Sequence, residues 1–223
     1  MTDFVVAIDG PAGSGKSSVS REVARRLGYD YLDTGAAYRA LAWHCLERGV
    51  DTLSADDVIE ELPAFAYTIS VDPDARWVRV GSEDVTDDIR EPRISGTVSN
   101  VARIAAVREH VNALFRQLMA ASPKPGIIVE GRDITTIVAP DAQVRILLTA
   151  AAEVRMARRV AELQTVATPE VTAQQLKDRD SQDSRVVDFM NAAEGVTTVD
   201  STDLDFEQTV QAVADIVRRT LVP

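Results

Sequence analysis

Short apolar runs alternate with longer amphipathic segments along this chain of 223 residues. Five of the runs have the length and composition of buried strands: 4–8, 29–32, 127–129, 144–148 and 196–199. Apolar residues at helical spacing predict helices between them, over a segment ending at Leu27 and over 35–48, 98–121, 151–164 and 205–221. Such alternation is typical of a parallel sheet with helices on both faces. We therefore predict an α/β fold with a five-stranded parallel sheet.

Two segments interrupt this alternation. Residues 65–89 contain short strand-like runs around a turn at 72–75, which predicts a hairpin-like insert. Residues 164–178 are mostly polar and contain Thr168-Pro169, which is typical of a mobile cover. We expect a single domain. Its core, insert and lid are predicted at these positions: core 1–62, 90–152 and 186–223, β-rich insert about 63–89, helical lid about 153–185.

A glycine-rich run follows the first apolar run and fits the phosphate-loop pattern G-x-x-x-x-G-K-[ST]. Backbone N–H groups of such a loop surround a phosphate, and the next helix presents its N-terminus to the same anion. Lys16 would reach the β- and γ-phosphates, and the Ser17 hydroxyl would bind Mg²⁺. A chance match on a surface turn is the alternative, but the flanking strand and helix argue against it. The predicted ATP-binding residues are Gly10, Pro11, Ala12, Gly13, Ser14, Gly15, Lys16, Ser17 and Ser18.

Charge and cysteine content exclude several classes of protein. A net charge of −11 argues against a nucleic-acid partner, because binding to the backbone needs concentrated Lys and Arg. No run approaches the ~20 apolar residues that span a bilayer, and we expect no signal peptide. The single cysteine, Cys45, cannot form an internal disulfide, which favours the reducing cytoplasm. A locally basic segment, 90–108, is either an anion site or a solvated helix face.

Polar motifs follow the predicted strand ends, where ligands bind in parallel sheets. Arginines near these ends and at the borders of the predicted lid suit phosphate, although any one of them could be a surface residue paired with an acid. They are Arg39, Arg132, Arg155, Arg158, Arg159, Arg179 and Arg185. The only histidines, His44 and His110, fall in predicted helices, where surface or packing roles are expected, and exclude a multi-histidine site.

Five segments together resemble bacterial cytidylate kinases nearly end to end. The phosphate loop is shared by many NTPases, whereas the second and fourth segments are more diagnostic. The segments are Asp9-Gly-Pro-Ala-Gly-Ser-Gly-Lys-Ser-Ser18, Leu32-Asp-Thr-Gly-Ala-Ala-Tyr-Arg39, Glu83-Asp-Val with Ile89-Arg90, Val129-Glu-Gly-Arg-Asp-Ile134 and Arg179-Asp-Ser-Gln-Asp-Ser184. The resemblance implies a P-loop kinase with a β-rich monophosphate-binding insert and a closing lid.

The resemblance also implies roles for individual residues. Arg39 and Arg132 would hold the acceptor phosphate, and both would act in catalysis with Lys16 and Arg158. The remaining acceptor residues divide by the part of CMP that they would face. Thr34, Arg108 and Asp133 would face the base, Ser99, Arg179 and Asp183 the sugar, and Tyr38 and Arg185 would complete the CMP site.

The chain departs from the family pattern at two places. The segment before Arg185 is one residue short, so that this arginine would reach the nucleotide less well. Thr135 replaces the usual glycine, and we expect its side chain to narrow the loop, or to strain it where a positive φ is needed.

The sequence thus predicts a cytoplasmic, monomeric kinase that moves the ATP γ-phosphoryl group to CMP or dCMP with Mg²⁺. A regulatory GTPase is a rival, but its Asn-Lys-x-Asp and Asp-x-x-Gly segments do not occur in the chain. Kinases of adenylate, uridylate or shikimate remain open alternatives.

Overall fold

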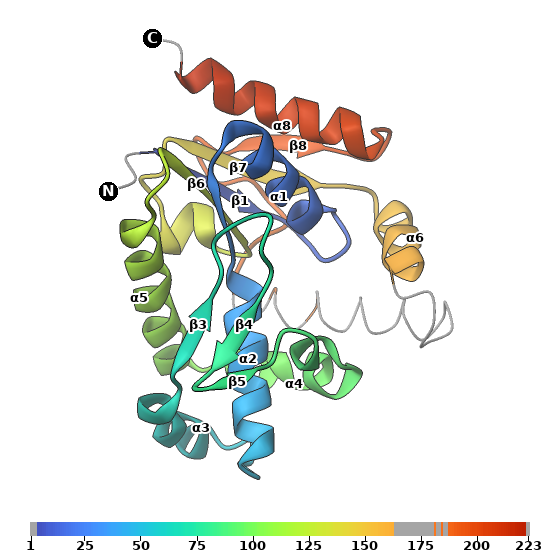
Figure 1. Cartoon of the computed structure of the whole chain (residues 1–223). Coiled ribbons are helices and arrows are strands. Elements are labelled where there is room, and N and C mark those ends of the chain that lie inside the picture. Colours follow the sequence, from blue (N-terminus) through green and yellow to red (C-terminus); the bar gives the residue numbers. More distant parts are fainter. Residues whose placement is uncertain (1–3, 163–180, 182–183, 185–186, 222–223) are drawn as a thin grey trace.

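The structure is a computed structural model that describes residues 4–162, 181, 184 and 187–221. Its centre is a five-stranded parallel sheet with strand order β2-β6-β1-β7-β8 (Figure 1). The strands are β1 (Phe4–Asp9), β2 (Asp30–Asp33), β6 (Gly126–Gly131), β7 (Val144–Thr149) and β8 (Thr197–Asp200). All five predicted strands and their parallel arrangement are therefore confirmed, with ends that differ by one or two residues.

Helices pack on both faces of this sheet, as predicted. The structure contains the helices α1 (Lys16–Leu27), α2 (Thr34–Glu47), α3 (Ala55–Glu61), α4 (Pro92–Ala102), α5 (Ala105–Ala121), α6 (Ala152–Glu162) and α8 (Phe206–Leu221). Of these, α1 and α8 pack on one face and α2 and α5 on the other. Alternate residues of β1 point to opposite faces: Val6 and Ile8 pack with α1 and α8, and Ala7 packs with α2 and α5. The sheet is thus the middle layer of three (Figure 1).

One helix prediction was wrong. The segment 98–121 is not a single helix, because the chain turns between α4 and α5 at Ile104, which has extended backbone angles. Val98, Val101, Ile104 and Val107 are all buried, at spacings that a continuous helix would also give. The break therefore leaves no trace in the apolar periodicity. The short helix α3 was not predicted, since it buries a single residue, Val58.

A second, antiparallel sheet lies within the segment for which an insert was predicted. Its strands are β3 (Tyr67–Ile69), β4 (Val78–Val80) and β5 (Glu83–Asp84). The apolar residues of β3 and β4 share one core with α2, and Figure 1 shows this sheet lying against that helix. The predicted cover at 164–178 lies outside the described residues. Within the described part, no helix combines the length and apolar character needed to cross a membrane.

The strand register brings polar residues together at one edge of the parallel sheet. Asp9 at the end of β1 pairs with Gly131 of β6, and Asp33 at the end of β2 pairs with Glu130. The phosphate loop and the segment after β6 both begin at this edge. A ligand site is expected here, where the carboxyl ends of the strands meet.

Candidate active site

The loop between β1 and α1 has the backbone shape that the sequence predicts. Gly13 and Gly15 have φ of 76° and 87°, which side-chain-bearing residues rarely adopt. A Cβ at Gly13 would also lie 2.5 Å from the carbonyl oxygen of Arg155. Helix α1 begins directly after Gly15, so its free N–H groups point back into the loop. The loop is therefore built to surround an anion.

Glu130 links the phosphate loop to β6. Its Oε1 accepts hydrogen bonds from the Ser17 hydroxyl at 2.7 Å and from the Tyr31 hydroxyl at 3.2 Å. Its Oε2 lies 3.9 Å from the Lys16 Nζ. Burial, reinforced by the negative charge of Asp33, raises the pKa of Glu130 above its ordinary value, and Lys16 and Ser17 oppose this shift. From the sequence, Glu130 was expected only as part of a segment that resembles the family, with no role of its own.

Asp33 positions a second group of charges at the edge of β2. It caps α2 by accepting from the Ala36 N–H at 3.1 Å, and it pairs with Arg39 at 3.0 Å. Burial works to raise the pKa of Asp33, but the charges of Arg39, Arg90 and Lys16 outweigh burial and lower it. Arg39 and Lys16 therefore act on the same carboxylate.

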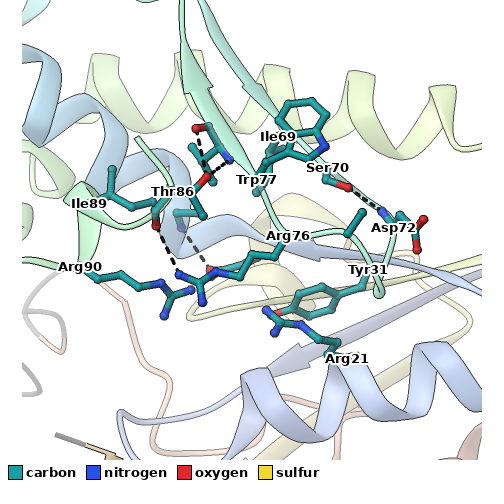
Figure 2. A pocket seen from close by; sticks show the side chains of 14 residues that line it. Arg21, Tyr31, Ile69, Ser70, Asp72, Arg76, Trp77, Thr86, Ile89 and Arg90 are labelled. Carbon is teal, nitrogen blue, oxygen red and sulfur yellow. Dashed lines mark hydrogen bonds between the residues drawn. The ribbon is translucent and has the colours of Figure 1, made fainter. Parts of the chain in front are cut away.

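Arg90 lies beside this group of charges, although from the sequence it was placed only in the basic segment 90–108 and in one of the segments that resemble the family, without a role of its own. Its pKa is lowered mainly by partial burial and, to a smaller extent, by repulsion from Arg39 and Arg76. Figure 2 shows Arg76 and Arg90 beside a small cavity under the antiparallel sheet, across from Arg21, which lies 5.2 Å from the Tyr31 ring. A cavity of about 30 Å³ is too small for a nucleotide. The side chains of Arg21, Arg76 and Arg90 line this cavity and give the border of the site a positive charge.

The segment after β6 reaches the phosphate loop through Arg132. One Nη of Arg132 donates to the carbonyl oxygen of Gly10, and its guanidinium lies 4.6 Å from the Phe189 ring centre. Two regions predicted to hold the donor and the acceptor phosphate are therefore in direct contact.

The next residue, Asp133, pairs with Arg108 of α5 at 2.5 Å. Burial raises the pKa of Asp133, while Arg108 opposes the rise. The pKa of Tyr38 is raised mainly by burial and, to a smaller extent, by the negative charge of Asp133. Thr34 is buried and its hydroxyl donates to the Glu130 carbonyl at 2.7 Å. Four of the predicted acceptor residues therefore lie around the end of β6.

Helix α6 contacts the other side of the phosphate loop. Arg155 donates to the Ala12 carbonyl at 2.8 Å, and Arg158 donates to the Ser14 carbonyl at 3.3 Å. Arg158 also donates to the Ser201 hydroxyl at 2.9 Å, so its guanidinium links α6 to the end of β8.

The remaining predicted residues have few described contacts or lie outside the described residues. Ser99 is half-buried on α4. His44 is buried on α2, where its Nε2 lies 3.1 Å from Glu61, in agreement with a packing role. His110 is half-buried on α5. Arg179, Asp183 and Arg185 lie outside the described residues, as does the side chain of Arg159.

Thr135 does not strain its loop. Within the described ranges every residue with positive φ is a glycine, so a threonine is tolerated here. Its N–H and hydroxyl donate to the same oxygen of Asp9, at 2.8 and 2.6 Å, and the Ile134 N–H donates to the other oxygen at 2.8 Å. The side chain thereby connects the ends of β1 and β6.

Comparisons with known proteins agree with this geometry. The profile of a family described as cytidylate kinase matches residues 6–219. A cytidylate kinase of Cutibacterium acnes is 46% identical over 219 residues, 98% of this chain and 97% of that protein. A cytidylate kinase of Thermotoga maritima is 36% identical over 222 residues, 98% of each chain.

A solved structure of an uncharacterized protein from Eubacterium ventriosum covers 97% of this chain and 99% of its own, at 10% identity and a TM-score of 0.51. At that identity the likeness concerns the fold alone. The match of family and relatives over nearly the whole length is the stronger finding. The chain therefore belongs to the cytidylate kinase family and is a kinase that phosphorylates CMP or dCMP with ATP.

Proposed function

We propose that the donor phosphates bind in the loop Gly10 to Ser18 and that the acceptor nucleotide binds between α2, α5 and the segment after β6. The hydrogen bond from Arg132 to Gly10 is the observation that supports this most directly. It brings a guanidinium from the acceptor side to the first residue of the donor loop. Two phosphate groups held on these elements would be neighbours, as in-line transfer requires.

Charge neutralisation is the main task of the protein in this reaction. The acceptor phosphate is already ionised at neutral pH, so no general base is needed. Lys16 stabilises charge on the donor phosphates, and Arg39 and Arg132 hold the acceptor phosphate against its repulsion. Asp33 orients Arg39 through their ion pair. Arg158 is proposed to stabilise the transferred group, which would require it to leave the carbonyl acceptors that it contacts here.

Magnesium would bind where Ser17 meets Glu130. The Ser17 hydroxyl and the buried Glu130 carboxylate place two oxygen atoms 2.7 Å apart beside the phosphate loop, and oxygen is the ligand type that Mg²⁺ prefers. No cluster of three acidic, cysteine or histidine ligands occurs among the described residues, but an ion shared with ATP phosphates needs only one or two protein ligands. When bound, the ion would neutralise charge on the β- and γ-phosphates.

The base would be selected by Asp133 and Arg108. Cytosine has an amino group beside acceptor atoms, so a carboxylate can accept from the amino group while an arginine donates to the acceptors. Uracil presents an oxygen at the amino position and would face the carboxylate unfavourably. Thr34 and Tyr38 complete the base side, and Ser99, Arg179, Asp183 and Arg185 are proposed to contact the rest of CMP.

We further propose that the protein acts as a monomer in the cytoplasm. The single cysteine is buried and free, which suits a reducing compartment. An enzyme that opens and closes around two nucleotides needs no partner surface for catalysis. Light scattering after size-exclusion chromatography would test the monomer.

A coupled assay of ADP release tests the assignment of the site. The wild-type protein and Asp133→Ala are compared with CMP, dCMP, UMP, AMP and shikimate as acceptors. We expect the wild type to prefer CMP and dCMP, and Asp133→Ala to lose mainly its preference for CMP over UMP. An unchanged CMP-to-UMP ratio in this variant would contradict the assignment of the base site.

A further inference from the structure

Asn112 is a buried polar residue beside the proposed base site to which the mechanism assigns no role. It lies one turn after Arg108 on α5, and both side chains line a cleft of about 530 Å³, a size typical of small-molecule sites. The residue is 6% exposed. Its side-chain oxygen is buried and accepts no hydrogen bond within the described structure.

The arginines of this cleft have protein partners, and its acidic residue, Glu109, is exposed to solvent. Arg108 pairs with Asp133, Arg103 donates to the Leu53 carbonyl at 3.0 Å, and Arg116 donates to the Ile137 carbonyl at 2.8 Å. These three cations are fixed by protein groups. Asn112 is therefore the buried polar side chain whose acceptor remains available to a ligand.

A second buried group without a hydrogen bond in the described part of the chain belongs to Tyr38, which contacts α5 through Phe115. The Tyr38 hydroxyl makes no hydrogen bond within the described residues, and the Tyr38 ring meets the edge of the Phe115 ring at 6.3 Å. Phe115 follows Asn112 by three positions, so the two residues are neighbours on the surface of α5. Asp133 and Arg108 are also close enough to act on Tyr38 electrostatically. Two buried polar groups that make no hydrogen bond to the residues described, the Asn112 oxygen and the Tyr38 hydroxyl, therefore belong to the elements proposed to bind the base.

An unpaired buried acceptor has an energetic cost. It destabilises a folded protein relative to a satisfied or apolar side chain. The cost is removed when a donor arrives from the ligand. The amino group of cytosine has two N–H donors, and the proposed contact with Asp133 uses one of them. The Asn112 oxygen makes no hydrogen bond that would be lost on turning the amide toward the cleft.

We infer that Asn112 is a further specificity-determining residue, whose side-chain oxygen accepts the second amino hydrogen of the cytosine base. This inference rests on the proposed position of the base between Arg108 and Asp133. Uracil would place an oxygen against the Asn112 oxygen as well as against Asp133. Asn112 would therefore strengthen discrimination against UMP at the base edge.

The test compares Asn112→Leu, which keeps the size but removes the amide, with the wild type. Gln117→Leu is the matched control, because Gln117 is an exposed amide on the same helix. We expect Asn112→Leu to raise KM for CMP and to lower the CMP-to-UMP ratio of kcat/KM about tenfold, as the loss of one hydrogen bond of about 1.4 kcal/mol predicts. Its melting temperature should equal or exceed that of the wild type, since the unpaired acceptor is gone. Gln117→Leu should change neither the CMP-to-UMP ratio of kcat/KM nor the KM for CMP.

Two results would overturn the inference. An unchanged CMP-to-UMP ratio in Asn112→Leu, together with a reduced ratio in Asp133→Ala, would leave the base site intact and show that Asn112 has only a packing role. A lowered melting temperature with equal losses for CMP and UMP would also contradict it, because that pattern indicates that the amide stabilises the fold and does not select the base. If Asp133→Ala also kept its ratio, the proposed base site itself would be wrong.

Discussion

The Ser17 hydroxyl donates a hydrogen bond to the buried carboxylate of Glu130, at 2.7 Å. This contact joins the phosphate loop to the neighbouring strand at the place proposed for Mg²⁺. We predict that Glu130→Gln, which keeps the shape but removes the charge, raises the Mg²⁺ concentration needed for half-maximal activity. Measuring the rate against Mg²⁺ at saturating ATP and CMP tests this. An unchanged Mg²⁺ dependence would place the ion away from Glu130.

Stability of the same variant should depend on pH in a defined direction. Burial raises the pKa of Glu130 above 4.5, so the folded protein holds this proton more tightly than the unfolded chain. The contribution of Glu130 to stability is therefore fully present at pH below 4.5 and is lost as pH rises through the raised pKa. Glutamine does not titrate, so the stability of Glu130→Gln does not fall in this way as pH rises. Its melting temperature relative to the wild type should increase from pH 4.5 to pH 8, and a constant difference would contradict the shift.

Lys16 should be required for turnover more than for folding. Its ammonium group lies at the start of α1, beside the glycine loop and 3.9 Å from Glu130. We expect Lys16→Ala to reduce kcat by about 10²- to 10³-fold, the effect of removing one preorganised charge from a transition state. Lys124→Ala, at an exposed position outside the site, is the control. Steady-state kinetics of both variants would show whether the loss is specific.

The positions of the strands and the glycine loop could be predicted because both depend on local patterns. A mostly apolar run such as 144–148 predicts a buried strand from its own composition, and the spacing from Gly10 to Ser17 is read directly from the sequence. The break at Ile104 could not be predicted, since its side chain fills the core just as a helical residue would.

The roles of Glu130 and Arg90 depend on contacts between distant segments. Glu130 lies 113 positions from Ser17, and only the strand order brings the two together. Arg90 and Arg39 both lower the pKa of Asp33, because α2 packs beside the turn that carries Arg90. No periodicity or motif spacing within one segment contains this information. The same limit applies to Asn112, whose burial and lack of a partner are properties of the folded chain.

Arg90 should contribute to binding of the acceptor phosphate. Its repulsion by Arg39 and Arg76 would be relieved by an anion between them. We predict that Arg90→Ala raises KM for CMP about 10- to 100-fold, the value of one charge-assisted hydrogen bond, with a smaller change in KM for ATP.

Arg93→Ala is the control for Arg90→Ala. Arg93 lies three positions away and pairs on the surface with Glu91 and Glu47, at 2.6 and 2.8 Å, so its loss should leave KM for CMP unchanged. Equal effects of both variants, or equal increases in KM for ATP and CMP, would show that Arg90 acts through overall charge rather than at the acceptor.

Thr135 should stabilise the protein through its hydroxyl. Asp9 is 3% exposed, and the hydroxyl donates to its Oδ2 at 2.6 Å. Thr135→Val keeps the shape but leaves this oxygen with one donor fewer, which should lower the free energy of unfolding by about 1.5–3 kcal/mol. Thr135→Ser keeps the donor and should lose less than Thr135→Val. Urea denaturation at neutral pH measures both variants. If valine were as stable as the wild type, the threonine would not anchor Asp9, and its presence in place of glycine would need another explanation.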